Sequence, residues 1–441
     1  MKKRMDKRIE GFSKLTKAQK IDWITRTHFN NPENAKSSLS SYWNTDSVLQ
    51  NKHDEFIENT LTNFYMPLGV APNFVINGTV FSIPMVIEES SVVAAAGNAA
   101  KFWGSRGGFK AEVVDTIKVG QVHFLFNGDP TLIHSFFEKN KSELLEATSE
   151  FSVNMEARGG GIQSIWLLDK SELILDYFQL HLRFKTADAM GANFINSCLE
   201  SIASKWEELA QKENQFLKEG KLEVVMSILS NYVPECLVRA SVQCPVSDLS
   251  PGKDWAGAAF AKKMVQAVEI AKKEPYRAVT HNKGIMNGVD AVVMATGNDF
   301  RAVEAGVHAY ASKSGHYTSL STAYIKDEVF HMELELPLAL GTVGGLTKLH
   351  PLVQWSMELL GNPDAKTLMK IVAVAGLAQN FAALRSLVTS GIQKGHMKMH
   401  LLNILNQLGA SENEKEAAKA YFNKNAVSVK SVSQFLLKLR P

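Results

Sequence analysis

Two short runs decide the fold class: Glu112-Val-Val-Asp-Thr-Ile-Lys118 and Gly120-Gln-Val-His-Phe-Leu-Phe126. Their Val, Ile and Phe residues are typical of β-strands. Two further runs of this kind, Ile162–Leu168 and Tyr177–Phe184, follow a helical stretch from Asp129 to Ser149. Strands that alternate with a helix over so short a length predict a compact α+β insert in the chain.

The segment before this insert contains a hairpin signal. Residues 64–93 are rich in Val, Ile, Phe and Pro, and Asn77-Gly78 interrupts them. Asn-Gly between β-favouring runs is typical of a tight hairpin turn. We therefore expect Asn73–Ile76 and Val80–Pro84 to pair as strands, and the Ala-rich stretch Ser90–Trp103 to form a helix.

Most of the remaining chain is expected to be helical. Residues 14–28, 191–217 and 253–272 show the apolar spacing of helices. Residues 281–315 pair a glycine-punctuated apolar segment with a further helix. Asn362-Pro363-Asp364 predicts a helix start, with a cap followed by Pro in the first turn.

Composition and charge exclude several classes of protein. The chain has 441 residues, 45% of them hydrophobic and 21% charged, which is ordinary for a globular protein. Its 48 Lys and Arg against 45 Asp and Glu give a formal charge of +3, so no broad basic surface for nucleic acid is expected. The basic start, Met1–Arg8, lacks the apolar stretch of a secretory signal, and polar residues interrupt the apolar segment Ile371–Val388. We expect a cytoplasmic protein that does not span a membrane.

The three cysteines, Cys198, Cys236 and Cys244, show no C-x-x-C spacing, so neither a disulfide framework nor a zinc site is predicted. They resemble reduced cytosolic thiols. The sequence also lacks a phosphate-binding G-x-x-x-x-G-K-[ST] loop, and Arg158-Gly159-Gly160-Gly161 departs from the Rossmann pattern because Ser164 replaces the third glycine.

Six other segments carry the candidate chemistry: Pro84–Ser91, Asp188–Asn193, His281–Gly288, Ala295–Asp299, Gly341–Gly345 and Gly395–Met397. In this order they resemble the 3-hydroxy-3-methylglutaryl-coenzyme A reductases, in particular the soluble bacterial class II enzymes. The resemblance covers most of the chain, from about Glu58 to His396. One departure is Thr62, where family members commonly have Gly.

The resemblance implies an α+β fold in which a small ferredoxin-like, non-Rossmann dinucleotide-binding domain is inserted into a large mixed domain. It also implies a helical C-terminal flap and a homodimer, or an oligomer built from dimers, with the active site at the interface. The expected ranges are 1–111 and 221–390 for the large substrate-binding and dimerisation domain, 112–220 for the small domain and 391–441 for the flap.

Four residues are catalytic by this resemblance. Lys283 stabilises the developing oxyanion and Asp299 orients Lys283, while Glu89 is the acid and His396 protonates the departing coenzyme A thiolate. Each also has a plainer interpretation from the residues alone. Glu89 could complement a helix dipole, Lys283 could be a solvated surface cation, Asp299 could cap a helix, and His396 could simply be exposed.

The remaining site residues follow from the same motifs. Ser91, Arg277 and Asn287 match positions that contact the substrate, where an Arg suits a carboxylate. Small residues before a long helix let backbone N–H groups approach a phosphate, although from the residues alone a capped helix with a tight packing contact is the more common arrangement. The expected cofactor-binding residues are Asp188, Met190, Gly191, Asn193, Gly341, Thr342, Val343 and Gly344.

The implied reaction is a two-step, four-electron reduction of 3-hydroxy-3-methylglutaryl-CoA to mevalonate and CoA, which supplies isoprenoid precursors. It uses two molecules of NADPH or NADH and no metal. The alternatives are an acyl-CoA hydrolase or lyase that needs no nicotinamide, and an inactive binding relative. An assay of dinucleotide oxidation in the presence of substrate distinguishes the reductase from both alternatives.

Overall fold

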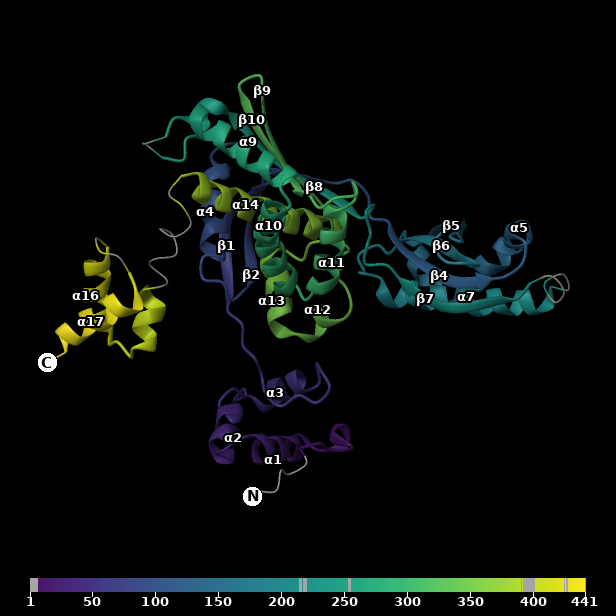
Figure 1. Cartoon of the computed structure of the whole chain (residues 1–441), viewed down its shortest axis with the longest axis horizontal. Coiled ribbons are helices and arrows are strands. Elements are labelled where there is room, and N and C mark those ends of the chain that lie inside the picture. Colours follow the sequence, from purple (N-terminus) through teal and green to yellow (C-terminus); the bar gives the residue numbers. More distant parts are fainter. Residues whose placement is uncertain are drawn as a thin grey trace. The chain divides into compact units, whose positions relative to one another are not determined.

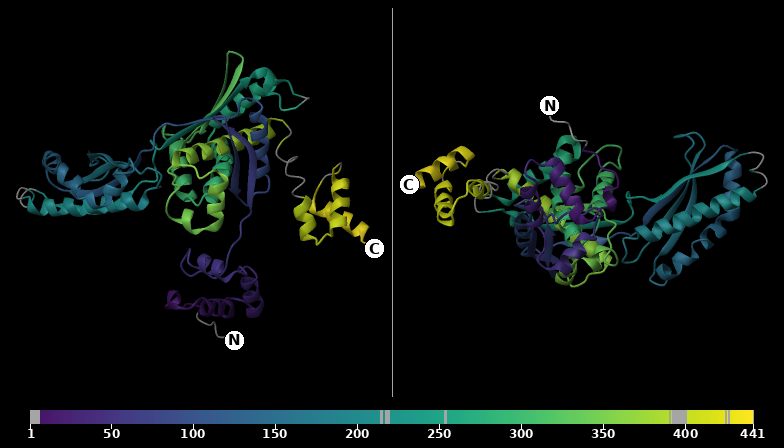
Figure 2. Two further views of the ribbon diagram at one scale, coloured as in Figure 1. Left: turned by 180° about the vertical axis from the view of Figure 1, so that it is seen from behind. Right: turned by 90° about the horizontal axis from the view of Figure 1, so that it is seen from below.

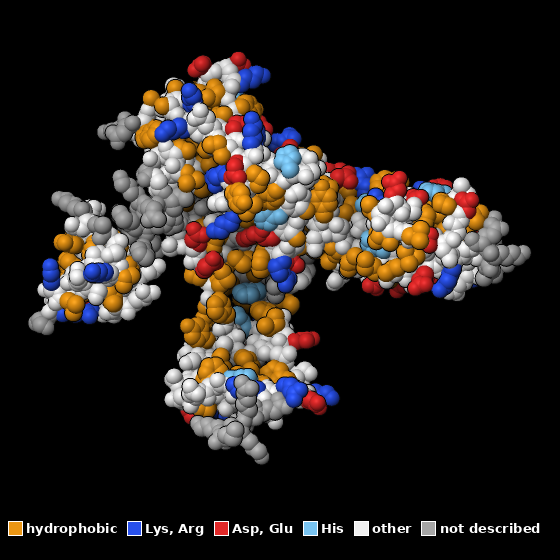
Figure 3. Space-filling model, viewed as in Figure 1, with side chains coloured by type: hydrophobic (Ala, Val, Ile, Leu, Met, Phe, Trp, Pro, Cys, Tyr) orange, Lys and Arg blue, Asp and Glu red, His pale blue; other side chains and the backbone are white. Residues whose placement is uncertain are grey.

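The computed structural model describes residues 7–213, 216, 220–252, 255–389, 391, 401–423, 425 and 427–440 (Figure 1). Residues up to Pro67, together with Leu349–Pro351, form one compact unit, and the rest of the chain forms a second. Helices and antiparallel sheets are both present, which confirms the α+β class. On the face shown in Figure 3, basic and acidic side chains are interspersed rather than gathered into one field.

The first unit is helical. A short 3₁₀ turn, Phe12–Lys14, precedes α1, and the helix expected over residues 14–28 is confirmed. Thr16 and Gln19 form a reciprocal capping box at the start of α1. The helices of this unit are α1 (Lys17–His28), α2 (Pro32–Ser40) and α3 (Ser47–Asp54).

The second unit begins with the expected hairpin, which is confirmed. β1 (Leu68–Ile76) pairs with β2 (Thr79–Val86) through a turn at Asn77 and Gly78. Both turn residues have positive φ, 49° and 89°, as the tight turn of a two-residue hairpin requires. The expected helix follows as α4 (Val92–Gly104), which packs against β1.

The large core combines a four-stranded antiparallel sheet, in the order β3-β8-β10-β9, with long helices. Its central pair is α10 and α14, and a Cβ atom on Gly288 of α10 would lie 2.4 Å from the Ala375 carbonyl oxygen of α14. The 24-residue helix α14 is long and apolar enough to cross a membrane, but most of it is buried inside the protein. The elements are β3 (Lys110–Val113), β8 (Leu237–Pro245), β9 (Ser321–Lys326), β10 (Val329–Pro337), the 3₁₀ turn Val246–Leu249, α9 (Gly257–Lys273), α10 (Pro275–Ala295), α11 (Phe300–Ala311), α12 (Leu346–Leu349), α13 (Pro351–Leu359) and α14 (Ala365–Val388).

A smaller module has its own sheet, in the order β5-β6-β4-β7, and its own apolar core. The chain order is strand, helices, strand, strand, helix, strand, which is the split βαβ arrangement. Helix α7 runs along one face of the sheet (Figures 1 and 2). The elements are β4 (Lys118–Phe126), α5 (Pro130–Glu146), α6 (Ser149–Glu156), β5 (Gly161–Asp169), β6 (Tyr177–Lys185), α7 (Ala192–Lys212) and β7 (Leu222–Leu229).

Two details of this region differ from the sequence-based expectation. The single strand expected over Glu112–Lys118 is wrong, because β3 ends at Val113 in the large sheet and β4 begins at Lys118 in the small one. The small sheet also continues past residue 220, where the expected insert ends, because β7 pairs with β4.

The C-terminal segment has a third, small apolar core. Residues 401–407 are helical, and α16 (Glu412–Phe422) and α17 (Val429–Leu439) follow. Leu405, Ala418 and Val432 are fully buried among these helices. The described part of the expected flap therefore forms a compact helical cluster.

Candidate active site

A cavity of about 490 Å³ lies beside the N-terminal half of α10. It is lined by the residues expected at the substrate end of the site, which come from two separate parts of the chain. They are Glu89, Ser91, Arg277, Lys283 and Asn287.

A carboxylate and an ammonium meet in this cavity. Lys283 Nζ lies 3.0 Å from Glu89 Oε2, and Asn287 Nδ2 donates to the same oxygen at 3.3 Å. Lys283 and Asn287 are four residues apart on α10 and so share one face of that helix. The Lys283 side chain is 63% exposed, so this ion pair contributes little to folding stability. Its position instead suits chemistry with a ligand in the cavity.

Arg277, one turn and a half before Lys283, adds a second cation. Burial lowers its pKa, and no acidic group in the described part of the chain is close enough to compensate. A half-buried guanidinium without a carboxylate partner is favourable for an anionic ligand.

His281, which was not among the candidate site residues, also lines the cavity. Its Nε2 lies 2.7 Å from Ser321 Oγ, and Asn380 Nδ2 lies 3.2 Å from the same nitrogen. Burial and the charge of Arg277 lower the pKa of His281 to about 3, so the ring is neutral at physiological pH. Its place two residues before Lys283 on a helix was the available sequence signal.

The second group of candidates surrounds the loop between β6 and α7. Thr342 N donates to the Asp188 carbonyl oxygen at 2.8 Å, and Ala365 N donates to Asp188 Oδ1 at 2.9 Å. Gly341 N donates to Asn298 Oδ1 at 2.8 Å. The structure therefore brings Asp188, Gly341 and Thr342 together, as expected for parts of one ligand site.

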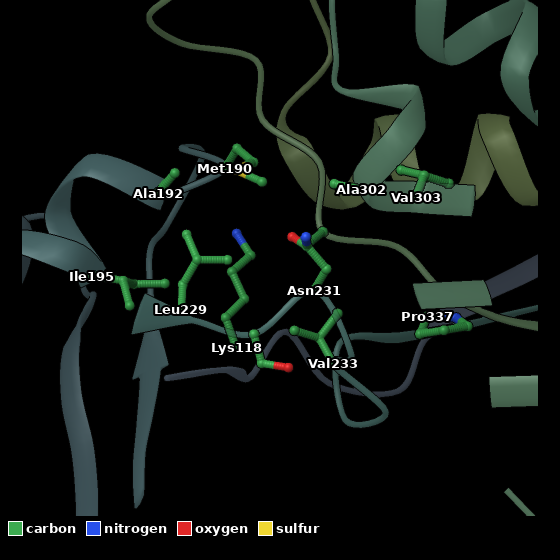
Figure 4. Close-up of a pocket in the computed structure, with 12 residues that line it drawn as sticks. Lys118, Met190, Ala192, Ile195, Leu229, Asn231, Val233, Ala302, Val303 and Pro337 are labelled. Carbon is green, nitrogen blue, oxygen red and sulfur yellow. The ribbon is translucent and has the colours of Figure 1, made fainter. Parts of the chain in front are cut away.

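Two cavities adjoin this loop. One of about 570 Å³ is lined by Asp188, Thr342 and Val343. A smaller one of about 20 Å³ is lined by Met190 (Figure 4). Gly344 has a φ of 85° in the loop after Val343.

The N-terminus of α7 is open to a ligand. Its N-cap, Gly191, has a φ of 97° and supplies no side chain to the first turn, which contains the exposed Asn193. A Cβ atom on Gly191 would also lie 2.4 Å from Thr186 Cγ2, so this position requires glycine for two reasons. Uncapped N–H groups at the start of a long helix favour an anion such as a phosphate.

Comparison with known proteins assigns the family. The model of the hydroxymethylglutaryl-coenzyme A reductase family matches residues 18–401. The chain belongs to this family. A reductase of Archaeoglobus fulgidus is 36% identical over 94% of this chain and 90% of its own length, and a probable reductase of Borreliella burgdorferi is 35% identical over 85% and 84%.

Solved structures of the class II reductase from Streptococcus pneumoniae have the same fold as this chain. One is 36% identical, covers 98% of this chain and 99% of its own, and has a TM-score of 0.72. Another, described as bound to NADPH in open conformations, is 38% identical over 86% of this chain and 99% of its own, with a TM-score of 0.71. The chain is therefore a class II member of the reductase family.

Of the other two catalytic candidates of this reductase, the structure places only Asp299, and it does not line the Lys283 cavity. His396 lies outside the described residues. Asp299 caps α11 by accepting from Arg301 N at 3.0 Å and Ala302 N at 3.2 Å, and it pairs with the Arg301 side chain at 3.1 Å. Partial burial raises the pKa of Asp299, but the bonds from Arg301 and Ala302 outweigh it and the net pKa is lowered.

The helix length explains why Asp299 is remote from Lys283. Asn298 N donates to the Val293 carbonyl oxygen, so Asp299 lies near the C-terminal end of α10. Val293 is ten residues after Lys283 on this helix, which corresponds to roughly 15 Å along the axis. Within one chain, the two side chains do not meet.

Gly341→Ala tests the packing between the two loops of the reductase. A Cβ atom there would lie 2.3 Å from Met190 N, so the backbone must move, and we expect a roughly tenfold higher KM for the dinucleotide. Such overpacking costs about 1–3 kcal/mol of stability. Steady-state kinetics and thermal unfolding measure both effects. Gly252→Ala is the matched control, because nothing lies within 4 Å of its Cβ position, and equal KM values in the two variants would contradict the prediction.

Proposed function

We propose that the chain catalyses the NAD(P)H-dependent reduction of 3-hydroxy-3-methylglutaryl-CoA to mevalonate and CoA. The reaction consumes two reduced dinucleotides and two protons and releases two oxidised dinucleotides. The observation that carries the proposal is the Lys283–Glu89 pair beside the uncompensated Arg277 in one cavity, within a chain of this family.

The first reduction develops negative charge on the thioester oxygen. Lys283 stabilises this oxyanion, since a positioned ammonium in a partly desolvated cavity interacts more strongly with it than water does. Arg277 holds the free carboxylate of the substrate, and Ser91 and Asn287 contact its polar groups. Collapse of the adduct releases the CoA thiolate, which His396 protonates, and leaves an aldehyde.

The second reduction converts this aldehyde into an alkoxide at the same position. Lys283 again stabilises the charge, and Glu89 supplies the proton that completes the primary alcohol. The 3.0 Å contact between Lys283 Nζ and Glu89 Oε2 places the ammonium and the carboxyl group at the same point of the cavity, where the new alkoxide forms.

The loop around Asp188 fits a dinucleotide. The uncapped start of α7 suits its phosphates, and the glycines at positions 191 and 341 leave room for backbone to approach a ligand. When bound, the reduced nicotinamide supplies the hydride for each step. On this basis we assign residues 118–229 as a small, ferredoxin-like dinucleotide-binding domain, with Asp188, Met190, Gly191, Asn193 and Gly341–Gly344 as its contacts.

A neighbouring cavity of about 560 Å³ suits the CoA portion of the substrate. It shares Ala95, Asn98 and Ala382 with the Lys283 cavity and therefore adjoins it. Two of its residues, Arg106 and Arg385, both lie against the Phe102 ring. Paired guanidinium groups at the exit of an acyl pocket are favourable for the phosphates of CoA.

The two groups of residues lie at opposite ends of α10, which supports a composite site between two copies. The Lys283 cavity lies beside its N-terminal half, whereas Asn298 and Gly341 lie beyond its C-terminal end. Hydride transfer requires contact, so we propose that the Lys283 cavity of one copy faces Asp299 and the Asp188 loop of another. Phe64, which is 94% exposed, is the kind of large aromatic residue that such an interface covers.

The remaining assignments follow from this proposal. Residues 391–441 form a flap that brings His396 to the thiolate. The three cysteines are buried free thiols, which agrees with a cytoplasmic enzyme.

An assay with substrate and each dinucleotide separately tests the function. We expect two dinucleotides to be oxidised for each CoA released. The dinucleotide, NADPH or NADH, that supports the faster reaction is the preferred cofactor. A hydrolase or lyase would release CoA without oxidation, and an inactive relative would do neither. Either of these outcomes would contradict the proposal.

A further inference from the structure

Lys118 is a buried lysine at the start of β4 that was not expected from the sequence to have a role. It is 4% exposed, and its side chain lies in the cavity that Met190 also lines (Figure 4). In the described part of the chain it has no carboxylate partner, and desolvation lowers its pKa. A buried ammonium without a counterion is costly, so a functional reason for this residue is needed.

The hydrogen bonds that the Lys118 ammonium makes in the described part of the chain go to the loop between β6 and α7. Its Nζ donates to Thr186 Oγ1 at 2.5 Å and to the Ala189 carbonyl oxygen at 2.8 Å. Thr186 Oγ1 also donates to that carbonyl oxygen at 2.7 Å. Three polar groups therefore close a small, buried network beneath the loop.

This network fixes a backbone that is not in a relaxed conformation. Ala187 has a φ of 47°, which costs energy for a residue with a Cβ atom, and Gly191 has a φ of 97°. The Ala189 amide donates to the Thr186 carbonyl oxygen at 2.9 Å, so both polar groups of Ala189 are held. Without Lys118, the Ala189 carbonyl would keep only the Thr186 hydroxyl as a partner.

The loop that is held in this way carries three of the proposed dinucleotide contacts, Asp188, Met190 and Gly191. It ends at Gly191, the uncapped start of α7, and the methyl carbon of Thr186 lies only 2.4 Å from the position that a Cβ atom of Gly191 would take. Displacement of Thr186 or Ala189 would therefore turn the first N–H groups of α7 away from a phosphate.

We infer that Lys118 is a positioning residue for dinucleotide binding, which sets the conformation of residues 186–191 through Thr186 and the Ala189 carbonyl. The inference rests on the proposed function of this loop. It predicts that Lys118 acts on affinity for the dinucleotide and leaves the acyl-CoA cavity, which is lined by other elements, unaffected.

The test is Lys118→Met, which keeps the length of the side chain and removes its donors. The dissociation constants of NAD(P)H and of CoA are measured for the full chain by dinucleotide fluorescence and by calorimetry. We expect the constant for the dinucleotide to rise about tenfold and that for CoA to stay within twofold. Unchanged dinucleotide binding, or an equal loss for both ligands, would overturn the inference.

Thr186→Val provides an independent arm in case Lys118→Met does not fold. It keeps the methyl group against Gly191 and removes the hydroxyl, and we expect a severalfold weaker dinucleotide affinity. In the double variant with Lys118→Met, the fold-loss of dinucleotide affinity should be smaller than the product of the two single losses, because both substitutions break the same network. Wild-type dinucleotide affinity in Thr186→Val would also overturn the inference.

Thr148→Val is the matched control within the same domain. Thr148 is likewise buried and donates to the Leu145 carbonyl oxygen at 2.7 Å, but it lies at the start of α6. We expect it to lower thermal stability without changing dinucleotide affinity. If the wild-type chain bound no dinucleotide, the proposed function of the loop would fail with the inference, whereas failure of the inference alone leaves wild-type binding intact.

Discussion

Lys283→Ala is expected to lower kcat about a thousandfold for the reduction of 3-hydroxy-3-methylglutaryl-CoA and for the reduction of added mevaldehyde. Both steps place negative charge on oxygen at one position, and Lys283 is the ammonium that faces the cavity there. Loss of one oxyanion donor typically costs 10²- to 10³-fold, and a full positive charge is at the upper end of this range. Dinucleotide oxidation with each substrate measures the two steps separately.

Stability should change little in this variant. The Lys283 side chain is 63% exposed, so its ion pair with Glu89 is screened by water. Lys273→Ala, on the exposed surface of α9, removes one positive charge from the chain and should keep full activity. If Lys283→Ala reduced mevaldehyde at a rate near that of the wild type, Lys283 would not be the group that stabilises both oxyanions.

Local signals in the sequence predicted the local structure well. Asn77-Gly78 predicted a hairpin because both residues tolerate positive φ, and the strands pair directly next to the turn, Ile76 with Thr79. The helix start near residue 362 was correct to within two residues. Asp364 rather than Asn362 is the cap, accepting from Thr367 N at 2.7 Å, and Pro363 precedes the helix instead of lying in its first turn.

Glycine residues misled the secondary-structure prediction at positions where a glycine is needed for a contact with a distant part of the chain. Gly284 and Gly288 suggested a punctuated segment, but both lie inside the continuous helix α10. Gly288 is there because α14 approaches so closely that a side chain would collide with Ala375. The partner helix is distant in the sequence, so no local pattern could show this contact.

The site was predictable in its parts but not in its geometry. The motifs selected five residues that the structure places around one cavity. They did not show that Asp299 lies at the far end of α10, because the spacing between motifs does not reveal that the intervening residues form one straight helix. Lys118 was missed because its partners, a hydroxyl and a carbonyl, leave no charge pattern in the sequence.

The remote position of Asp299 leads to a test by complementation between chains. Lys283→Ala and Asp299→Asn should each inactivate a homodimer in which every site takes Lys283 from one copy and Asp299 from the other. A mixed dimer contains one site with both wild-type residues and one with neither. Co-expression with two different affinity tags and purification through both should therefore yield dimers with about half of the wild-type activity.

The same experiment separates this arrangement from a site within one chain. A single-chain site would leave every site of the mixed dimer defective, so the doubly tagged protein would be inactive. Doubly tagged dimers of Lys283→Ala alone provide the background, because they contain no intact site in either arrangement. Lys283 and Asp299 are separated by roughly 15 Å along α10, which is too far for their side chains to bridge within one chain. We therefore expect activity to return only in dimers that combine the two variants.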